Sequence, residues 1–283
     1  MSLTAATRLA AVVGRPIRHS LSPVLHNAWL EAAGLDGAFV ALSVSEGRFA
    51  AFVEAFRGGS LAGVNVTLPF KTEALAAADL ASERALEAGA ANLLLFDPDG
   101  RVRADNTDGE GLLYAFARQA PDFRPDQGPL VIFGAGGAAR GAAAAFLAAG
   151  CPEVRIINRT RSRAEDLAAL FGRRVRVGEP GDGSLLEDAA ALVNASSAGL
   201  AEDPPSPPDF GSAPASAVAM DMTYRPLQTA FLTAAAGRGL KTVDGLDMLI
   251  GQAIPSFEAF FGQPPPARAD VRGRVLRILG EAT

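Results

Sequence analysis

The sequence predicts an α/β fold of two domains, and three observations support this prediction. Short β-rich runs alternate with amphipathic helical stretches along almost the whole chain, a signature of α/β architecture with parallel sheets. The length of 283 residues favours about two domains. An apolar run at residues 130–133 ends in a cluster of glycines, which is typical of a strand that leads into a nucleotide-binding turn.

The first hundred residues alternate between predicted strands and predicted helices. We expect strands at residues 9–13, 38–43, 62–66 and 91–96, and helices at 23–33, 48–57, 71–77 and 82–88. The segment Asp97-Pro98-Asp99-Gly100 predicts a hairpin turn that returns through residues 101–104. A helix over 109–119 and a polar, proline-containing linker over 121–129 lead into the second domain.

The second half of the chain continues the alternation. We expect strands at residues 130–133, 154–157, 175–177, 191–194, 217–221 and 241–244, with a proline-rich surface loop over 204–214. Helices over 245–261 and 269–280 belong to neither repeat, and we expect them to close over the first domain. The predicted domains are therefore residues 1–106 with 246–283, and residues 107–245.

The glycine-rich segment predicts a dinucleotide site of Rossmann type. Glycines at the end of a buried strand allow a tight turn and let the backbone approach a pyrophosphate at a helix N-terminus. A lone glycine cluster would fit a structural turn as well, but here a strand precedes it and an alanine-rich helix follows it. The residues expected to contact the cofactor in this turn are Gly134, Ala135, Gly136, Gly137 and Ala138.

The end of the next strand predicts NADP rather than NAD. Proteins of this plan that prefer NAD carry an acidic residue here, which hydrogen-bonds the ribose 2′-hydroxyl. This chain instead offers Asn158, Arg159, Thr160 and Arg163. Guanidinium groups bind phosphate oxygens bidentately, whereas a carboxylate would repel a 2′-phosphate, so charge favours NADP.

A second group of polar residues lies upstream of the nucleotide unit. Asn65, Thr67 and Lys71 follow one another through the end of a strand and a proline-bounded turn, and they offer ligands for a polyol or an oxyacid. A lysine at a helix start is electrostatically unusual because that end of a helix is partly positive; the alternative is a solvated surface lysine. Asp105 is the natural carboxylate partner, and we assign helix capping to Asp108 instead.

Two serines provide a further candidate contact. Ser20 and Ser22 alternate with Leu21, so both hydroxyls could face one ligand. Ser22 also precedes Pro23, and that order equally suits a helix N-cap followed by proline at the first helical position.

The composition excludes several classes of function. A net charge of -5 offers no basic surface for nucleic acid, and no apolar run approaches the ~20 residues of a membrane span. The stretch before the first strand is too short for a signal peptide, so we expect a cytoplasmic protein.

One cysteine, Cys151, excludes an internal disulfide framework, and we expect it to be a small buried residue. His19 and His26 lack the carboxylate cluster of a metal site, so we expect packing or local hydrogen bonding for both.

In these motifs the chain resembles the shikimate dehydrogenase family from end to end. The matching segments are residues 20–23, 65–71, 88–92, 105–109, 134–137, 158–160 and 244–252. There are two departures. Leu93 stands where the family often has threonine, and the segment 194–199 carries Ser196 in place of threonine.

The resemblance implies a two-domain enzyme that reversibly oxidises shikimate to 3-dehydroshikimate with NADP, a step of chorismate and aromatic amino-acid biosynthesis. It implies an N-terminal α/β substrate domain with a parallel-rich sheet, a Rossmann-type NADP domain, and C-terminal helices that return to the substrate domain. Lys71 and Asp105 would be catalytic, and Met222 and Gly245 would flank the nicotinamide. The implied substrate-binding residues are Ser20, Ser22, Asn65, Thr67, Asn92, Tyr224 and Gln252.

Three alternatives remain open. The nearest is the same fold acting on quinate, or on both substrates, with NAD as a further variation. A second is a non-catalytic NADP-binding sensor, which would have no need for both Lys71 and Asp105. The third is a folate-linked dehydrogenase, which would place its lysine in a tyrosine-containing helix; no tyrosine stands near Lys71. Either a monomer or a homodimer is consistent with the sequence.

Overall fold

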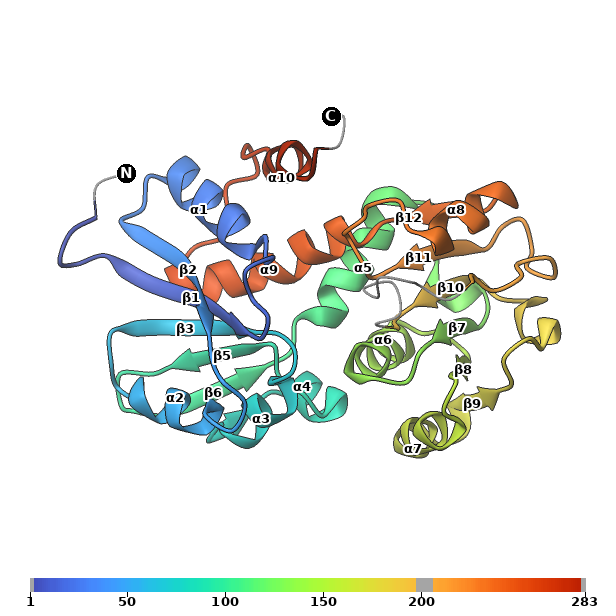
Figure 1. Cartoon of the computed structure of the whole chain (residues 1–283), viewed down its shortest axis with the longest axis horizontal. Helices are drawn as coiled ribbons and strands as arrows, with labels where there is room; N and C mark the ends of the chain where they lie inside the picture. The colour runs from blue at the N-terminus through green and yellow to red at the C-terminus, as the bar shows by residue number, and fades with distance from the viewer. Residues whose placement is uncertain (1–2, 197–205, 281–283) are drawn as a thin grey trace. The chain divides into compact units, whose positions relative to one another are not determined.

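The chain forms two compact units in a computed structural model that describes residues 3–196 and 206–280. The first unit comprises Met1–Thr107 and Gln252–Thr283, and the second comprises Asp108–Gly251 (Figure 1). The predicted boundaries were 106/107 and 245/246. The second boundary therefore lies further along the chain than predicted, inside the long helix α9 (Gly245–Phe261) rather than at its start.

The first unit is built on a six-stranded sheet in the order β2-β1-β3-β5-β6-β4. Strands β1, β2 and β3 are parallel, whereas β5 runs antiparallel to both β3 and β6. The predicted hairpin joins β5 to β6, with the Asp97 N–H donating to the Arg101 carbonyl at 2.9 Å. The strands are β1 (Arg8–Gly14), β2 (Gly37–Ser43), β3 (Leu61–Val66), β4 (Leu80–Ala81), β5 (Leu93–Phe96) and β6 (Val102–Asp105).

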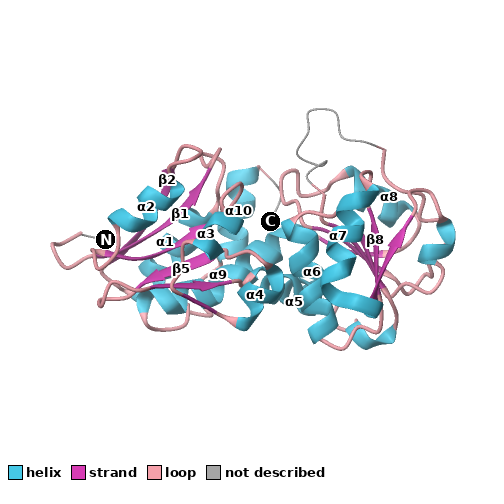
Figure 2. Cartoon of the chain, turned by 90° about the horizontal axis from the view of Figure 1, so that it is seen from below, coloured by secondary structure: helices cyan, strands magenta, loops and turns pink. Residues whose placement is uncertain are grey.

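Helices pack on both faces of this sheet (Figure 2). On one face, Phe49 and Phe70 belong to a core with Val64 and Leu94 of the sheet. On the other, Phe39 of β2 stacks on His26, and α10 joins α1 through an Arg274–Glu31 ion pair of 2.9 Å. The C-terminal helices thus return to the first unit, as predicted. The helices are α1 (Ser22–Ala33), α2 (Phe49–Ala55), α3 (Lys71–Ala76), α4 (Glu83–Ala88), the second part of α9, and α10 (Val271–Leu279).

The second unit is a doubly wound parallel sheet in the order β12-β11-β10-β7-β8-β9. All five strand pairs are parallel. The strand order reverses between β7 and β10, and ligands of such sheets bind outside the carboxyl ends of the strands at this point. The strands are β7 (Leu130–Phe133), β8 (Val154–Ile157), β9 (Val175–Gly178), β10 (Ala191–Asn194), β11 (Val218–Asp221) and β12 (Lys241–Val243).

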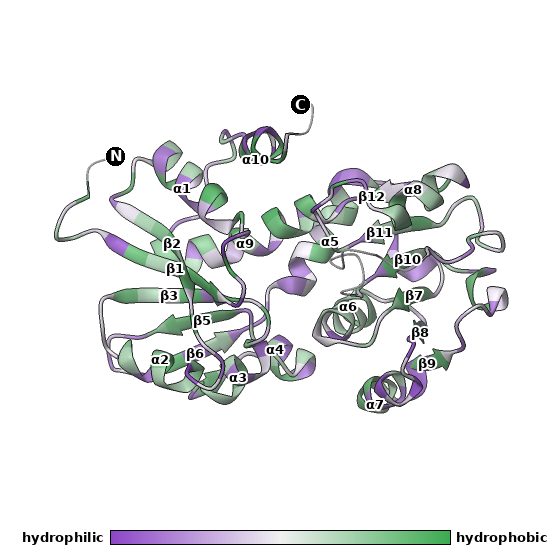
Figure 3. Ribbon diagram, viewed as in Figure 1, coloured by the Kyte–Doolittle hydropathy of each residue, from purple (hydrophilic) through white to green (hydrophobic). Residues whose placement is uncertain are grey.

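The central strands β7, β10 and β11 of this sheet are mostly apolar on both faces because helices cover both (Figure 3). Leu130 and Ile132 of β7 pack with α5 (Asp108–Gln119), α6 (Gly137–Ala148) and α7 (Arg161–Phe171). Val131, between them, packs on the opposite side with Phe231 of α8 (Ala230–Gly237). Cys151 is buried in the first of these cores, as expected. No helix of the described ranges is long and apolar enough to cross a membrane.

The structure moves several predicted helix starts by one or two residues, and two of these shifts concern predicted capping residues. Leu21, not Ser22, occupies the N-cap position of α1. Helix α5 begins at Asp108, so Asp108 lies in the first turn and Thr107 stands before it. The elements β4, α7 and α8 were not predicted. Part of the predicted loop at 204–214, and residues 197–199 of the segment that departs from the family pattern, lie outside the described residues.

Candidate active site

The end of β3 holds a buried amide with an open acceptor. Asn65 is only 4% exposed, and its Nδ2 donates to Ser256 Oγ at 2.8 Å and to the Asn92 carbonyl at 3.3 Å. Asn65 Oδ1 is buried and has no hydrogen-bond partner among the described residues. An unsatisfied buried acceptor costs about 1–3 kcal/mol, so a ligand hydroxyl at this oxygen would remove a penalty that the fold carries.

Two further predicted residues meet beside this amide. Asn92, the residue before β5, accepts a hydrogen bond from the Thr107 N–H at 2.8 Å through Oδ1. Its Nδ2 donates to Thr107 Oγ1 at 3.0 Å and to Gln252 Oε1, on α9, at 3.4 Å. The structure therefore brings Asn65, Asn92 and Gln252 together, although Gln252 lies 160 residues after Asn92 in the chain.

The backbone carbonyls of Lys71 and Asp105 accept hydrogen bonds from the two residues that precede β5. The Ala91 N–H donates to the Lys71 carbonyl at 2.8 Å, and the Asn92 N–H donates to the Asp105 carbonyl at 3.0 Å. Lys71 is the first residue of α3, as the sequence predicts, and Asp105 is the last residue of β6. The backbones of the two candidate catalytic residues are therefore hydrogen-bonded to two consecutive residues, Ala91 and Asn92. A direct contact between the Lys71 and Asp105 side chains stays a prediction.

The Asp105 carboxylate is paired with Arg84, a residue that no sequence motif indicated. Arg84 of α4 donates from Nε to Oδ1 and from Nη2 to Oδ2, each at 2.6 Å. Ser82 Oγ and the Asn106 N–H also donate to Oδ1, at 2.5 and 2.7 Å. Burial raises the pKa of Asp105, but the hydrogen bonds from Arg84 and Ser82 outweigh it and hold that pKa below its usual value.

The two serines lie at the N-terminus of the 12-residue helix α1. Ser22 is the first residue of the helix and Leu21 occupies the N-cap position, so the capping alternative for Ser22 is wrong. Ser22 is buried, and its N–H donates to Ser20 Oγ at 3.3 Å. Because the N-terminal end of a helix is partly positive, the surroundings of both serines suit an anionic group. Thr67 lies between β3 and α3, and its N–H donates to the Val13 carbonyl at 2.9 Å.

In the second unit, the glycine turn after β7 leaves room for a ligand. Gly134 has φ of 120°, and a Cβ there would lie 3.0 Å from the Ala195 and Ser196 backbone, so only glycine fits. At Gly136 and Gly137 a Cβ would meet nothing within 4 Å. Gly136 caps α6 without a side-chain hydrogen bond, so the N–H groups of the first turn are available to a phosphate. Ala135 and Ala138 complete this turn, and Ala138 is exposed.

Two arginines without an ion pair among the described residues stand at the junction of β8 and α7. Arg159 and Arg163 are exposed, and neither forms an ion pair within residues 3–196 and 206–280. Arg161 lies between them but is paired with Glu165 at 2.7 Å and with Glu179. The Asn158 side chain donates to the Thr160 carbonyl at 2.8 Å, which closes the turn before α7. Two of the three guanidinium groups can therefore bind a phosphate.

Met222 and Gly245 come together at the carboxyl ends of β11 and β12. A Cβ on Gly245 would lie 2.5 Å from the Met222 carbonyl oxygen, so this approach requires glycine. Tyr224, in the segment after β11, is half-buried. It belongs to the second unit, whereas Ser20 and Ser22 belong to the first, so its contact with the substrate carboxylate stays a prediction.

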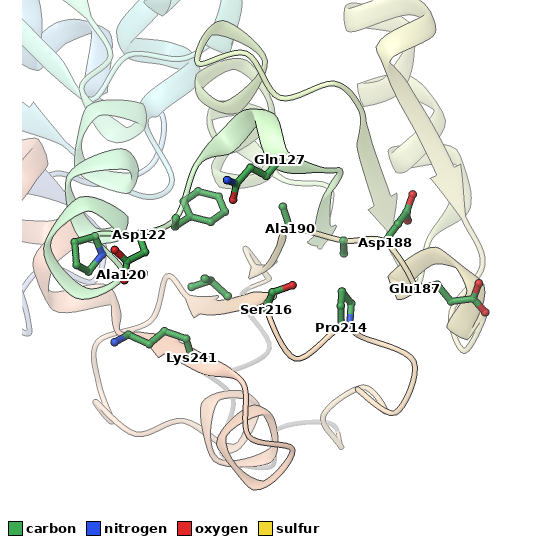
Figure 4. Close-up of a pocket in the computed structure, with 13 residues that line it drawn as sticks. Ala120, Asp122, Gln127, Glu187, Asp188, Ala190, Pro214, Ser216 and Lys241 are labelled. Carbon is green, nitrogen blue, oxygen red and sulfur yellow. The ribbon is translucent and has the colours of Figure 1, made fainter.

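A cavity of about 490 Å³ in the second unit lies away from these residues (Figure 4). Ala190, Val218 and Lys241 line it at the starts of β10, β11 and β12. In a parallel sheet this is the edge opposite to the carboxyl ends, where ligands of doubly wound folds bind. None of the predicted site residues lines it, so we do not assign it to the active site.

Comparisons with known proteins agree with this arrangement. A protein of Caulobacter vibrioides named shikimate dehydrogenase (NADP(+)) is 52% identical over 281 residues, which cover 99% of both chains. The chain belongs to the shikimate dehydrogenase family. The model of the shikimate dehydrogenase substrate binding domain matches residues 12–94, that of shikimate / quinate 5-dehydrogenase matches 118–197, and that of the shikimate 5'-dehydrogenase C-terminal domain matches 245–276.

Two solved structures of this family are similar over nearly the whole chain. Shikimate 5-dehydrogenase from Thermus thermophilus, in complex with NADP(H) and shikimate, is 36% identical with a TM-score of 0.85, over 96% of this chain and 99% of that one. Quinate dehydrogenase from Corynebacterium glutamicum, in complex with NAD, is 26% identical with a TM-score of 0.86, over 96% and 99%. The two structures thus differ in the substrate for which the enzyme is named and in the nicotinamide cofactor that is bound.

Proposed function

We propose that this protein is an NADP-dependent shikimate dehydrogenase, which reversibly reduces 3-dehydroshikimate to shikimate in the biosynthesis of chorismate and the aromatic amino acids. The unsatisfied, buried Asn65 Oδ1 beside Asn92 and Gln252 carries this proposal. A polyhydroxylated acid would give that oxygen a hydroxyl donor. Relatives that are 52% and 45% identical to this chain are named shikimate dehydrogenase (NADP(+)).

The substrate residues have distinct roles in this proposal. Ser20 and Ser22, at the positive end of α1, bind the carboxylate, and Tyr224 reaches the same group. Asn65, Thr67, Asn92 and Gln252 bind the ring hydroxyls. This division follows charge, because an anionic group is stabilised at a helix N-terminus, whereas amides and hydroxyls suit neutral hydroxyls.

The cofactor is NADP. The N–H groups at the start of α6 bind the pyrophosphate, and the approach of the phosphates requires the open space at Gly136 and Gly137. Arg159 and Arg163, with Asn158 and Thr160, surround the 2′-phosphate. Met222 and Gly245 flank the nicotinamide, which supplies the hydride when NADPH is bound.

In this proposal, Lys71 is the group that donates a proton to the substrate oxygen and accepts it back. In the reducing direction, negative charge grows on the ketone oxygen as the carbon accepts hydride; the Lys71 ammonium stabilises this charge and donates its proton, which leaves a hydroxyl and a neutral amine. In the oxidising direction the amine takes the hydroxyl proton back. Asp105 accepts a hydrogen bond from a substrate hydroxyl and balances the charge of Lys71. A cytoplasmic location, and a monomer or homodimer, stay predictions.

The test is the change in nicotinamide absorbance when the purified protein receives shikimate or quinate, each with NADP and with NAD. We expect rapid turnover of shikimate with NADP. Comparable turnover of quinate would instead establish the broader quinate/shikimate specificity, and a preference for NAD would contradict the role of Arg159 and Arg163. Binding of NADP without turnover of either substrate would identify a sensor.

A further inference from the structure

The two oxygens of the Asp105 carboxylate are used unequally. Among the described residues, Oδ1 accepts three hydrogen bonds, from Arg84 Nε, Ser82 Oγ and the Asn106 N–H, at 2.6, 2.5 and 2.7 Å. Oδ2 accepts one, from Arg84 Nη2 at 2.6 Å. An ionised carboxylate offers about two acceptor sites per oxygen, so Oδ1 is saturated and Oδ2 keeps one site. A substrate hydroxyl that reaches Asp105 therefore meets Oδ2.

The fold builds this pairing through a two-residue strand. Strand β4 pairs with β6, with Ala81 opposite Ala104, and the Ser82 N–H donates to the Ala104 carbonyl at 3.0 Å. Ser82 is also the N-cap of α4, and its hydroxyl accepts from the Ala85 N–H. The register of β4 thus places the first turn of α4, including Arg84, beside the end of β6. A bidentate arginine–carboxylate pair in this position fixes the plane of the carboxylate.

We propose that Arg84 is a positioning residue for the reaction, which clamps the Asp105 carboxylate so that Oδ1 is occupied and Oδ2 accepts from the substrate. This inference rests on the proposed function, because it takes Asp105 to be a substrate contact. Arg84 acts through Asp105 in two ways. It fixes the orientation of the acceptor, and its charge keeps the half-buried carboxylate ionised.

A pH experiment on Asp105 has to separate the effect of Arg84 from the effects of the other charged residues nearby. Helices α3 and α4 and strands β4 and β5 all neighbour β6. Strands β4 and β5 contain no charged residue. The charged residues of the remaining elements, apart from Arg84 and Asp105, are Lys71 and Glu73 on α3, Glu83 and Glu87 on α4, and Arg103 on β6. Of these, Arg103 is a suitable control, because the negative charge of Asp105 contributes to raising the pKa of its guanidinium.

The experiment compares Arg84→Gln and Arg84→Lys with Arg103→Gln in the full-length protein. Arg103 forms a similar two-bond pair with Asp97, at 2.8 and 3.0 Å, so its loss removes one positive charge and one bidentate pair from the same sheet. We expect Arg84→Gln to lower kcat/KM for shikimate roughly 10- to 100-fold, the range for a lost charge-assisted hydrogen bond. Arg103→Gln should stay within about 2-fold of wild type, since Asp97 is no part of the site.

The pH dependence separates orientation from charge. Without the guanidinium, burial dominates at Asp105, so its carboxyl protonates at higher pH and the acidic limb of the kcat/KM profile moves up. Arg84→Lys keeps the charge but not the two-bond geometry. It should therefore restore much of the acidic limb while kcat/KM stays low.

Carbon-13 NMR titration of aspartate carboxyls gives a readout without substrate, with Asp105 assigned from the spectrum of Asp105→Asn. We expect the Asp105 carboxyl to titrate at higher pH in Arg84→Gln than in wild type. Equal titration, or an Arg84→Gln enzyme with wild-type kcat/KM, would overturn the proposal. A wild-type protein that does not turn over shikimate would overturn the proposed function instead, and the NMR titration would still decide the effect of Arg84 on Asp105.

Discussion

Among single residues, Lys71 has the central role in the proposed reaction, and a second lysine of the chain provides a control. Lys71→Ala removes the proposed proton donor, so we expect kcat to fall about 10²- to 10⁴-fold. Ser20→Ala removes a proposed contact to the substrate carboxylate, so we expect mainly a higher KM, by roughly 10-fold. Steady-state kinetics with shikimate and NADP would measure both.

The control for Lys71 is Lys241→Ala, because the chain contains only two lysines. Lys241 lines the cavity at the opposite edge of the second sheet and should be dispensable for turnover. A Lys71→Ala enzyme that keeps near-normal kcat would show that another group handles the proton.

Ser256 is a residue whose role emerges only from the fold. Its hydroxyl accepts the short hydrogen bond from Asn65 Nδ2 and donates to the Gln252 carbonyl at 3.1 Å. We expect Ser256→Ala to raise the KM for shikimate several-fold at similar kcat, because the Asn65 amide loses the partner that orients it. The free energy of unfolding should fall by about 1 kcal/mol.

A double-mutant cycle checks that this effect passes through Asn65. In an Asn65→Ala background, Ser256→Ala should leave the KM unchanged. An equal increase in KM in both backgrounds would mean that Ser256 acts on the substrate by another route.

At the scale of elements, we propose that the junction of β8 and α7 decides which nicotinamide cofactor binds. The double variant Arg159→Ala with Arg163→Ala should raise the KM for NADP roughly 10- to 100-fold and leave the KM for NAD almost unchanged, because only NADP carries the 2′-phosphate. The matched control is Arg161→Ala, whose guanidinium is already paired with Glu165 and Glu179. Equal losses for NADP and NAD would place the arginines elsewhere than at the 2′-phosphate.

The elements that the sequence predicted well are those with a strong local signal. The run at β7 is apolar at every position because helices cover both faces of the sheet, and the glycines after it mark the turn. Helix α8 was missed because its alanine-rich sequence, with Phe231, Leu232 and Ala235 buried, has little polar face to reveal a helical period. Strand β4 was missed because two residues carry no periodicity at all.

At the scale of the whole molecule, a buried histidine couples stability to pH. His26 is fully buried among Trp29, Phe39 and Phe257, and neither ring nitrogen has a hydrogen-bond partner in the described ranges. Burial lowers the pKa of His26 from 6.5 to about 3. The folded protein therefore keeps His26 neutral between these values, while the unfolded chain binds a proton. Stability consequently falls as the pH drops below 6.5, by about 2 kcal/mol at pH 5.

Urea unfolding at pH 7 and pH 5 would measure this contribution. We expect His26→Leu to lose about 2 kcal/mol less than wild type between the two pH values. His19→Leu is the control, since His19 is the chain's other histidine and is exposed. If the two variants lost stability equally on acidification, His26 would not be the group responsible.

The sequence by itself determined the nucleotide unit, the alternation of strands and helices, and the residue types of the site. These features depend on neighbours within a few positions: an apolar run, a glycine turn, a lysine at a helix start. Tertiary structure alone decided which side chains meet. Arg84 reaches Asp105 because β4 pairs with β6, and Ser256 reaches Asn65 across 191 residues because the second part of α9 packs in the first unit. Such contacts follow from strand register and helix packing between distant segments, which no local pattern encodes.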